Sequence, residues 1–203
     1  MYARVARFEG RDPSLTDELV QRVRDVGPAS VPDAKGFLGL FDRDRGTALG
    51  ITFFDSEDAI RSSEQSFEDM AKQFPQEMRG RRTSVDVCEV VFFEGDAERA
   101  KAARVSAFEG RPDQIDDSVD KVRSETVPRV RELKGYVGIF GLADRKSGRL
   151  TAITLWESED ALRQSEEQAN KLRAQAAEAG GQRIGSVDRY AVEVAQQLSG
   201  VRA

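Results

Sequence analysis

Five residues in the second half of this chain could together bind a small aromatic molecule and polarise it. Aromatic rings form flat walls for stacking, and hydroxyl groups form hydrogen bonds at the rim of a ligand. An arginine can hold an anionic or enolate oxygen by charge-assisted hydrogen bonds. We therefore predict a binding site with Trp156 as its wall and Tyr136 and Thr154 beside it, and with Tyr190 and Arg104 as candidate catalytic residues.

Packing is the alternative role for the same side chains. Tryptophan is commonly buried for packing alone, so Trp156 could simply close one end of a core, and the two tyrosines could be structural. Arg104 and its counterpart Arg4 could form salt bridges instead of binding a ligand. The acids that could pair with them include Glu9, Glu109, Asp86 and Asp188. The single cysteine, Cys88, lies in a valine-rich stretch, which indicates a small buried hydrophobic residue.

The composition excludes several classes of chemistry. The 203 residues include no histidine and one cysteine, so the commonest metal ligand, the commonest general base and any intramolecular disulfide are missing. We expect no metal, no cofactor and no Ser-His-Asp or Cys-His catalysis. The formal net charge of -5 disfavours nucleic acid as a partner. No run approaches the roughly 18 apolar residues of a membrane span, and the start lacks a secretory signal, so we expect a cytoplasmic protein without a membrane partner.

The chain is a tandem duplication. The segment ITFFDSEDAIR at 51–61 returns as ITLWESEDALR at 153–163. Similarity at a nearly constant spacing is the signature of a repeated structural unit. Further blocks recur in the same order, 3–11 as 103–111, 35–41 as 134–140 and 84–86 as 186–188. We predict a first repeat over residues 1–93, a linker over 94–102 and a second repeat over 103–203.

Each repeat alternates strand-like and helix-like segments. Apolar residues three and four apart predict one helix that begins after Ser14 and ends at Gly27-Pro28, and a second that begins after Ser56, with Ser158 as the matching N-cap in the second repeat. Short runs rich in Val, Ile and Phe predict the strands of the first repeat at 4–9, 36–41, 49–55 and 84–93. The order strand, helix, strand, strand, helix, strand is the ferredoxin-like arrangement, with two helices on one face of a four-stranded antiparallel sheet.

The other face of each sheet also carries apolar residues and must be covered, and the second copy in the same chain is the obvious partner. We therefore predict an α+β protein in which two antiparallel four-stranded sheets form a barrel with the helices outside. This arrangement is a pseudo-dimer within one chain, and exposed edge strands leave further homodimerisation open. We expect the face with Gly50, Thr52 and Phe54 to line the barrel, because small residues leave room beside an aromatic wall.

The two repeats differ in their polar aromatic residues. The only Trp and two of the three Tyr lie in the second repeat, where the first repeat has Phe or Cys. Phe54 stands at the position of Trp156, and Phe37 at that of Tyr136. If only one pocket works, we expect it in the second repeat.

The repeats resemble the antibiotic biosynthesis monooxygenase-like (ABM) domains of the dimeric α+β barrel superfamily. The resemblance rests on an aromatic strand end followed by acidic-Ser-x-acidic-Ala, at 54–59 and 156–161, and on the Lys-Gly-aromatic-x-Gly strands that begin at Lys35 and Lys134. It implies a ferredoxin-like fold and, for characterised relatives, oxygen insertion into aromatic polyketides or quinols without metal or flavin. Many relatives carry a histidine where this chain has Ser63 and Ser165, and the haem-degrading branch depends on a histidine ligand.

Two functions follow from these patterns. The first is a cofactor-independent monooxygenase, an oxidoreductase that acts on a small polyketide- or quinol-like aromatic. Tyr136 and Tyr190 would then donate hydrogen bonds and Arg104 would stabilise the substrate anion. The second is a non-catalytic protein of the same fold that binds a small molecule or acts as a scaffold, and the missing histidine in both repeats favours it.

Overall fold

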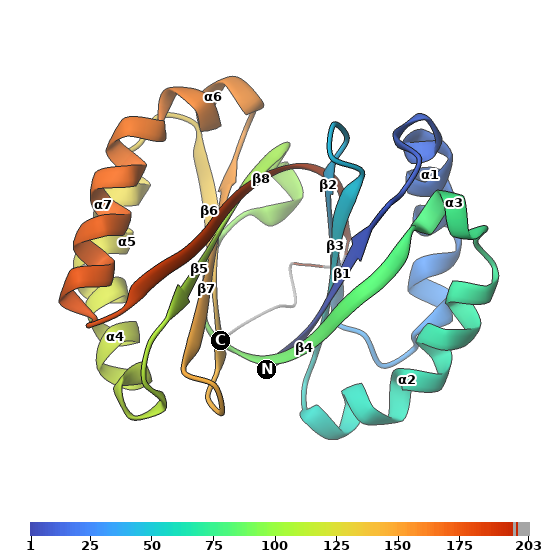
Figure 1. Ribbon diagram of the computed structural model, residues 1–203, viewed down its shortest axis with the longest axis horizontal. Helices are drawn as coiled ribbons and strands as arrows, with labels where there is room; N and C mark the ends of the chain where they lie inside the picture. Colours follow the sequence, from blue (N-terminus) through green and yellow to red (C-terminus); the bar gives the residue numbers. More distant parts are fainter. Residues whose placement is uncertain (197, 199–203) are drawn as a thin grey trace. The chain divides into compact units, whose positions relative to one another are not determined.

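The computed structural model describes residues 1–196 and 198, and within them the order of elements is the predicted one (Figure 1). The first repeat contains β1 (Tyr2–Glu9), α1 (Thr16–Ser30), β2 (Gly36–Asp42), β3 (Thr47–Phe54), α2 (Glu57–Lys72), the short α3 (Gln76–Arg79) and β4 (Arg81–Gly95). The second contains β5 (Ala102–Glu109), α4 (Ile115–Lys121), α5 (Val127–Arg131), β6 (Tyr136–Asp144), β7 (Arg149–Trp156), α6 (Glu159–Gln164), α7 (Glu166–Ala179) and β8 (Arg183–Gln196).

The strands follow the hydrogen-bonding order β1-β3-β2-β8-β5-β7-β6-β4, and this order closes on itself as a barrel. The predicted class, α+β with antiparallel strands in a closed barrel, is confirmed. Two compact units share the strands: residues 1–87 with 191–196 form one, and residues 88–190 form the other. Strands β4 and β8 therefore each belong partly to both units.

The predicted boundaries of the repeats stay a prediction. A short 3-10 turn, Ala97–Arg99, occupies the segment expected as a linker. Residues 197 and 199–203, at the end of the predicted second repeat, lie outside the described residues.

The second helix of each repeat begins where the sequence predicts. The hydroxyl of Ser56 accepts a hydrogen bond from the Ala59 amide at 3.1 Å, and the hydroxyl of Ser158 accepts one from the Ala161 amide at 3.1 Å. In the second repeat the helix divides at Ser165 into α6 and α7. These caps satisfy amides that a helix start leaves without partners.

The first helix differs from its prediction at both ends. It runs through Gly27-Pro28 to Ser30, so this pair does not end it. It follows a 3-10 turn, Pro13–Leu15, whose cap is Asp12 and not Ser14. A Gly-Pro pair is a strong breaker in sequence terms, but tertiary packing of the apolar residues of α1 overrides local preference.

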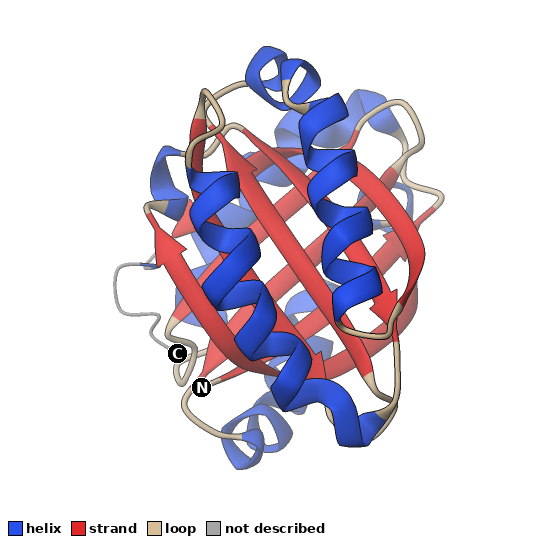
Figure 2. Cartoon of the chain, turned by 90° about the vertical axis from the view of Figure 1, so that its left-hand side faces the viewer, coloured by secondary structure: helices blue, strands red, loops and turns tan. Residues whose placement is uncertain are grey.

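The helices of each repeat cover one face of the strands of that repeat (Figures 1 and 2). In the first repeat, Phe54 packs against Ile60 and Phe67 of α2, and the Phe54 and Phe67 rings meet edge to face at 6.2 Å. The face with Gly50, Thr52 and Phe54 therefore lies under the helices, and the expectation that it would line the barrel is wrong. The rings nearest to Gly50 on this face are those of Phe37 and Phe8, from the two neighbouring strands.

Candidate functional site

A cavity of about 340 Å³ lies in the first unit between the strands and helices α1 and α2. Its size falls at the lower end of the range of small-molecule pockets, about 300–1,000 Å³. Most of its wall is apolar, and five phenylalanines contribute to it: Phe8, Phe37, Phe41, Phe67 and Phe74. The polar or charged side chains at the wall include Arg4, Arg11, Thr52, Arg79, Arg82, Glu68, Lys72 and Gln196.

The floor of the cavity is a row of small residues across three strands. Ala6 of β1 pairs with Gly50 of β3, and Gly50 pairs with Gly39 of β2. A Cβ added at Gly39 would lie 3.2 Å from Phe37, Phe41 and Val194. Glycine at this position therefore lets two aromatic rings and the neighbouring strand β8 close around the floor.

In the second unit, larger side chains occupy the equivalent space. The same row reads Ser106, Ala152 and Gly141, and the next residue across is Phe92, where the first unit has Val194. The Phe92 ring lies on Gly141, since a Cβ there would be 2.3 Å from it. Arg173 reaches Ser106 with a 3.1 Å hydrogen bond, from the helix position that Ala71 holds in the first repeat. Thus the side chains of Phe92 and Arg173 occupy, in the second unit, the space that the smaller Val194 and Ala71 leave empty in the first.

Arg11 brings an unpaired charge to the wall of the cavity. Its side chain is 4% exposed, and its Nη1 donates to the Thr16 hydroxyl at 3.1 Å. Its Nε and Nη2 are buried without a hydrogen-bond partner. Burial is the main cause that lowers the pKa of Arg11, and the nearby charge of Arg43 adds to it. Among the described residues, no carboxylate lies within ion-pair distance of Arg11.

The other buried arginine of this cavity, Arg4, is already paired. Its Nε and Nη2 donate to the two oxygens of Glu64 at 2.8 and 3.0 Å. Its guanidinium also lies over the Phe67 ring, 4.0 Å from the ring centre. The hydrogen bond from Arg4 holds the pKa of Glu64 below its ordinary value. Arg4 therefore already has a counter-charge, whereas Arg11 has two buried donors without an acceptor.

The residues predicted from the second repeat contact one another. Trp156 is fully buried, and its Nε1 donates to the Thr154 hydroxyl at 3.1 Å. Tyr136 meets the Trp156 ring edge to face at 6.3 Å, and its hydroxyl donates to Glu94 at 2.9 Å. Burial, together with Glu94, raises the pKa of Tyr136 well above its ordinary value. Their roles as ligand-binding residues stay a prediction.

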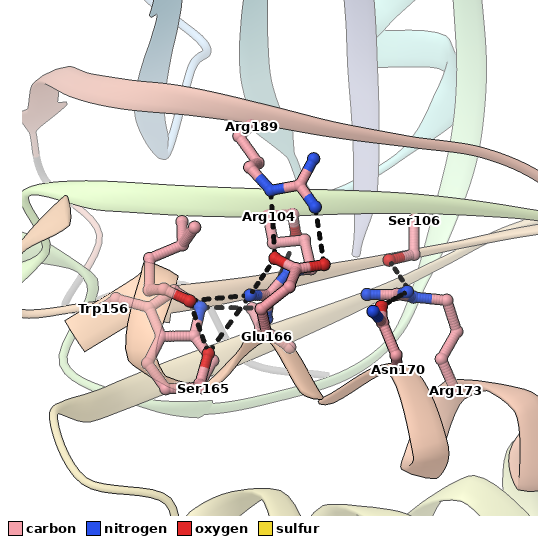
Figure 3. Close-up of polar contacts among 10 residues, drawn as sticks. Arg104, Ser106, Trp156, Ser165, Glu166, Asn170, Arg173 and Arg189 are labelled. Atoms are coloured by element: carbon pink, nitrogen blue, oxygen red, sulfur yellow. Dashed lines mark hydrogen bonds and ion pairs between the residues drawn. The ribbon is translucent and has the colours of Figure 1, made fainter. Parts of the chain in front are cut away.

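Of the two candidate catalytic residues, Arg104 joins this group and Tyr190 lies buried on β8. The Arg104 guanidinium is 5.3 Å from the centre of the Trp156 ring. Its Nη2 donates to the Leu162 carbonyl at 2.8 Å and to Ser165 and Glu166 at 3.1 Å each (Figure 3).

The carboxylate bound to each duplicated arginine comes from the second helix of its repeat: Glu64 for Arg4 and Glu166 for Arg104. Neither acid is among the partners considered from the sequence. The signal was available, because both acids occupy the same position of the repeat, directly after Ser63 and Ser165.

No known protein-family profile matches the chain. The uncharacterized protein Rv2557 of Mycobacterium tuberculosis is 26% identical over 190 residues, which cover 91% of this chain and 84% of that protein. The crystal structure of an anthrone oxidase-like protein has a TM-score of 0.70 at 14% identity, and the match covers 100% of this chain and 95% of that one.

A ferredoxin-fold protein related to antibiotic biosynthesis monooxygenases, from Listeria monocytogenes, has a TM-score of 0.54 at 11% identity and matches 94% of both chains. The chain has the ABM-like fold. A haem-degrading enzyme from Listeria monocytogenes also matches, with a TM-score of 0.51 at 11% identity over 93% of this chain and 99% of that enzyme. At these identities the ABM-like similarity concerns the fold and leaves the reaction open.

Ser63 and Ser165, the positions at which the resemblance to ABM-like domains implies a histidine, are both buried. Ser63 is 3% exposed and Ser165 is 6% exposed. The Ser165 hydroxyl donates to the Leu162 carbonyl at 2.7 Å while it accepts from Arg104. In the described part of the chain, no three Cys, Asp or Glu side chains come together as a metal site would need, and no helix is long and apolar enough to cross a membrane.

Proposed function

We propose that the cavity of the first repeat binds a small aromatic molecule that carries an acidic oxygen. The observation that carries this proposal is Arg11, a buried cation with two unpartnered nitrogens at the wall of an apolar cavity of about 340 Å³. A buried cation without a counter-charge is costly, and an anionic oxygen on the ligand would supply one and accept from the two free nitrogens. The phenylalanine walls would hold the aromatic body of the ligand by stacking and burial.

The cavity also suits cofactor-independent oxygenation, which is the second candidate function. Structures of the same fold include an anthrone oxidase-like protein. In such a reaction a substrate CH₂ group becomes a C=O group, and the second oxygen atom of O₂ leaves as water. Arg11 would stabilise the substrate anion in a pocket whose apolar walls exclude water.

That second function also needs a group that takes a proton from the substrate. Glu68 of the cavity wall is paired with Arg82 at 2.6 Å, and Glu64 is paired with Arg4 of the same wall. The substrate would then have to be acidic enough to lose its proton to water without a protein base. Arg11 would stabilise the resulting anion. Binding is therefore the function that the geometry supports better.

Replacement of Arg11 tests the proposal directly. We expect wild-type protein to gain thermal stability with 1-hydroxy-2-naphthoate, a flat acid, and much less with neutral naphthalene, because binding to the folded state alone raises the melting temperature. Arg11→Met should weaken naphthoate binding by about 10- to 100-fold, the value of a hydrogen bond to a charged group. Without ligand, the Arg11→Met variant should be at least as stable as wild type, because an unpaired buried charge is removed.

Arg111→Met is the matched control. Arg111 holds the equivalent position of the second repeat but is exposed and paired with Asp113. Equal binding by wild type and Arg11→Met would refute the proposal. Oxygen consumption with anthrone, measured on the same proteins, separates catalysis from binding. A loss of binding in a Trp156→Phe, Tyr190→Phe double variant, with Arg11→Met unaffected, would instead favour the site predicted in the second repeat.

A further inference from the structure

Two arginines of the second unit bind one carboxylate, and a third arginine lies to one side of it (Figure 3). Arg189 of β8 binds Glu166 through two hydrogen bonds of 3.0 and 2.5 Å, and Arg104 of β5 binds the same carboxylate at 3.1 Å. Among the described residues, the hydrogen bonds of Arg173 of α7 go to neutral groups, Ser106 at 3.1 Å and Asn170 at 2.6 Å. We call these three arginines and Glu166 the arginine cluster. Its positive charge exceeds its negative charge by two.

The cluster also has unused hydrogen-bond donors. Arg104 is 2% exposed, and its Nε and Nη1 are buried without partners. In the described residues Arg173 has no ion pair. Burial is the main cause that lowers the pKa of Arg104 and of Arg173, and the charge of Arg104 lowers that of Arg173 further. Positive charge is therefore crowded here, and an added anion would stabilise it.

The first repeat shows the same framework without the excess charge. Arg4 donates a hydrogen bond to each oxygen of Glu64, so the two charges of that pair are balanced. The positions of Arg173 and Arg189 hold Ala71 and Val87 in the first repeat. The fold therefore does not need these two arginines, and their presence distinguishes the second repeat.

We propose that the arginine cluster is a binding site for an oxyanion group of a small molecule, held between Arg173 and Arg189 with Arg104 beneath. Guanidinium groups suit phosphate and carboxylate because their donors form a planar fork. Two excess positive charges match a dianion, which favours a phosphate group over a single carboxylate. The side chains of Arg189 and Glu166 are 47% and 30% exposed, so an anion from solvent can reach the cluster. This site is separate from the cavity of the first repeat.

Titration with inorganic phosphate on the whole chain tests this site, because Trp156 lies beside Arg104 and its fluorescence reports on the cluster. At constant ionic strength we expect a saturable change with phosphate. Succinate, as a second arm, would show a comparable response if the site prefers dicarboxylates. Arg173→Ala and Arg189→Val, which install the residues of the first repeat, should each weaken binding by about tenfold or more, the value of a charge-assisted hydrogen bond.

The control variant is Arg22→Ala, which removes an exposed arginine of α1 that pairs with Glu18. It changes the net charge as Arg173→Ala does but touches none of the cluster residues, so phosphate affinity should stay within about twofold, because exposed charges are screened by salt. No saturable response to phosphate or succinate, or equal weakening in Arg22→Ala and Arg173→Ala, would overturn the proposal. Circular dichroism checks that each variant is folded. We expect the fold to be kept, because neither Arg173 nor Arg189 is fully buried.

Discussion

Arg4 and Arg104 occupy the same position of the two repeats, but their charges are compensated by carboxylates to different degrees. Each is buried on the first strand of its repeat, and each has its acid on the helix above. In the part of the chain that the structure describes, Glu64 forms an ion pair with Arg4 only, whereas Glu166 is shared between Arg104 and Arg189. The charge of Arg4 is thus fully compensated by its partner, and that of Arg104 is not.

The Arg4–Glu64 pair predicts a defined acid dependence of stability. The pKa of Glu64 is lowered from its ordinary value of 4.5, first by the hydrogen bond from Arg4. A carboxyl whose pKa is lower in the folded state stabilises the fold fully above its unfolded pKa, and this contribution is lost as pH falls through the folded pKa. Glu64→Gln should therefore reduce stability at pH 7 and weaken its decline in acid. We expect a loss of about 1 kcal/mol at pH 7, because buried Arg4 loses its counter-charge while solvent screens Glu64, whose side chain is 44% exposed.

Urea unfolding at pH 7 and at pH 3 measures both effects. The curves of wild type and Glu64→Gln should converge at the lower pH. Glu18→Gln is the control, because Glu18 forms an exposed pair with Arg22 and such pairs contribute about 0–1 kcal/mol. A constant difference between wild type and Glu64→Gln at both pH values would contradict the explanation.

At the scale of strands and helices, the sequence predicts the order of the elements better than it predicts which face of a strand meets the helices. Alternation shows that Gly50, Thr52 and Phe54 share one face, and Leu49, Ile51 and Phe53 the other. Both faces carry apolar residues and both are largely buried. Alternation alone therefore cannot tell which face meets the helices, and only the packing of Phe54 on Phe67 decides it.

The cavity was hidden from the sequence for a similar reason. Its floor depends on the register of neighbouring strands, which brings Ala6, Gly50, Gly39 and Val194 side by side. Polar aromatics pointed to the second repeat, but the volume of neighbouring side chains determines where space remains. The sequence did contain a difference that marks Arg11. Asp12-Pro13 follows Arg11, whereas Pro112-Asp113 follows Arg111, and Arg111 pairs with Asp113.

Val194→Phe tests this account of the cavity at the level of the sheet. It installs in the first unit the residue type that fills the second, where Phe92 lies on Gly141. We expect it to abolish naphthoate binding at an unchanged circular dichroism spectrum, with the Phe37 and Phe41 rings beside Gly39 shifting to admit the new ring. Binding is measured by calorimetry and folding by circular dichroism.

Gly50→Ala is the control on the same floor. A Cβ at Gly50 would lie 3.6 Å from the Phe37 ring, an ordinary contact. It should therefore preserve binding and stabilise the strand by about 0.5–1 kcal/mol, since alanine loses less backbone freedom than glycine. Unchanged naphthoate binding in Val194→Phe would show that the ligand lies elsewhere.

For the whole molecule, strands β4 and β8 matter most, because each contributes residues to both compact units. Residues 81–87 of β4 belong to the first unit and 88–95 to the second, and β8 passes in the other direction at residues 190 and 191. If one unit unfolds, it removes strand partners that continue into the other. We therefore expect both repeats to unfold in one cooperative transition.

Ile60→Ala measures this coupling. Ile60 is 2% exposed in the core of the first repeat, and its truncation should cost about 2–5 kcal/mol. Trp156, the only tryptophan, lies in the second repeat and reports its unfolding. In urea we expect the Trp156 fluorescence transition of Ile60→Ala to shift to lower concentration together with the circular dichroism signal. Leu162→Ala, at the equivalent position of the second repeat, should shift both signals alike. A Trp156 transition that stays at the wild-type midpoint in Ile60→Ala would mean that the repeats unfold independently despite their shared strands.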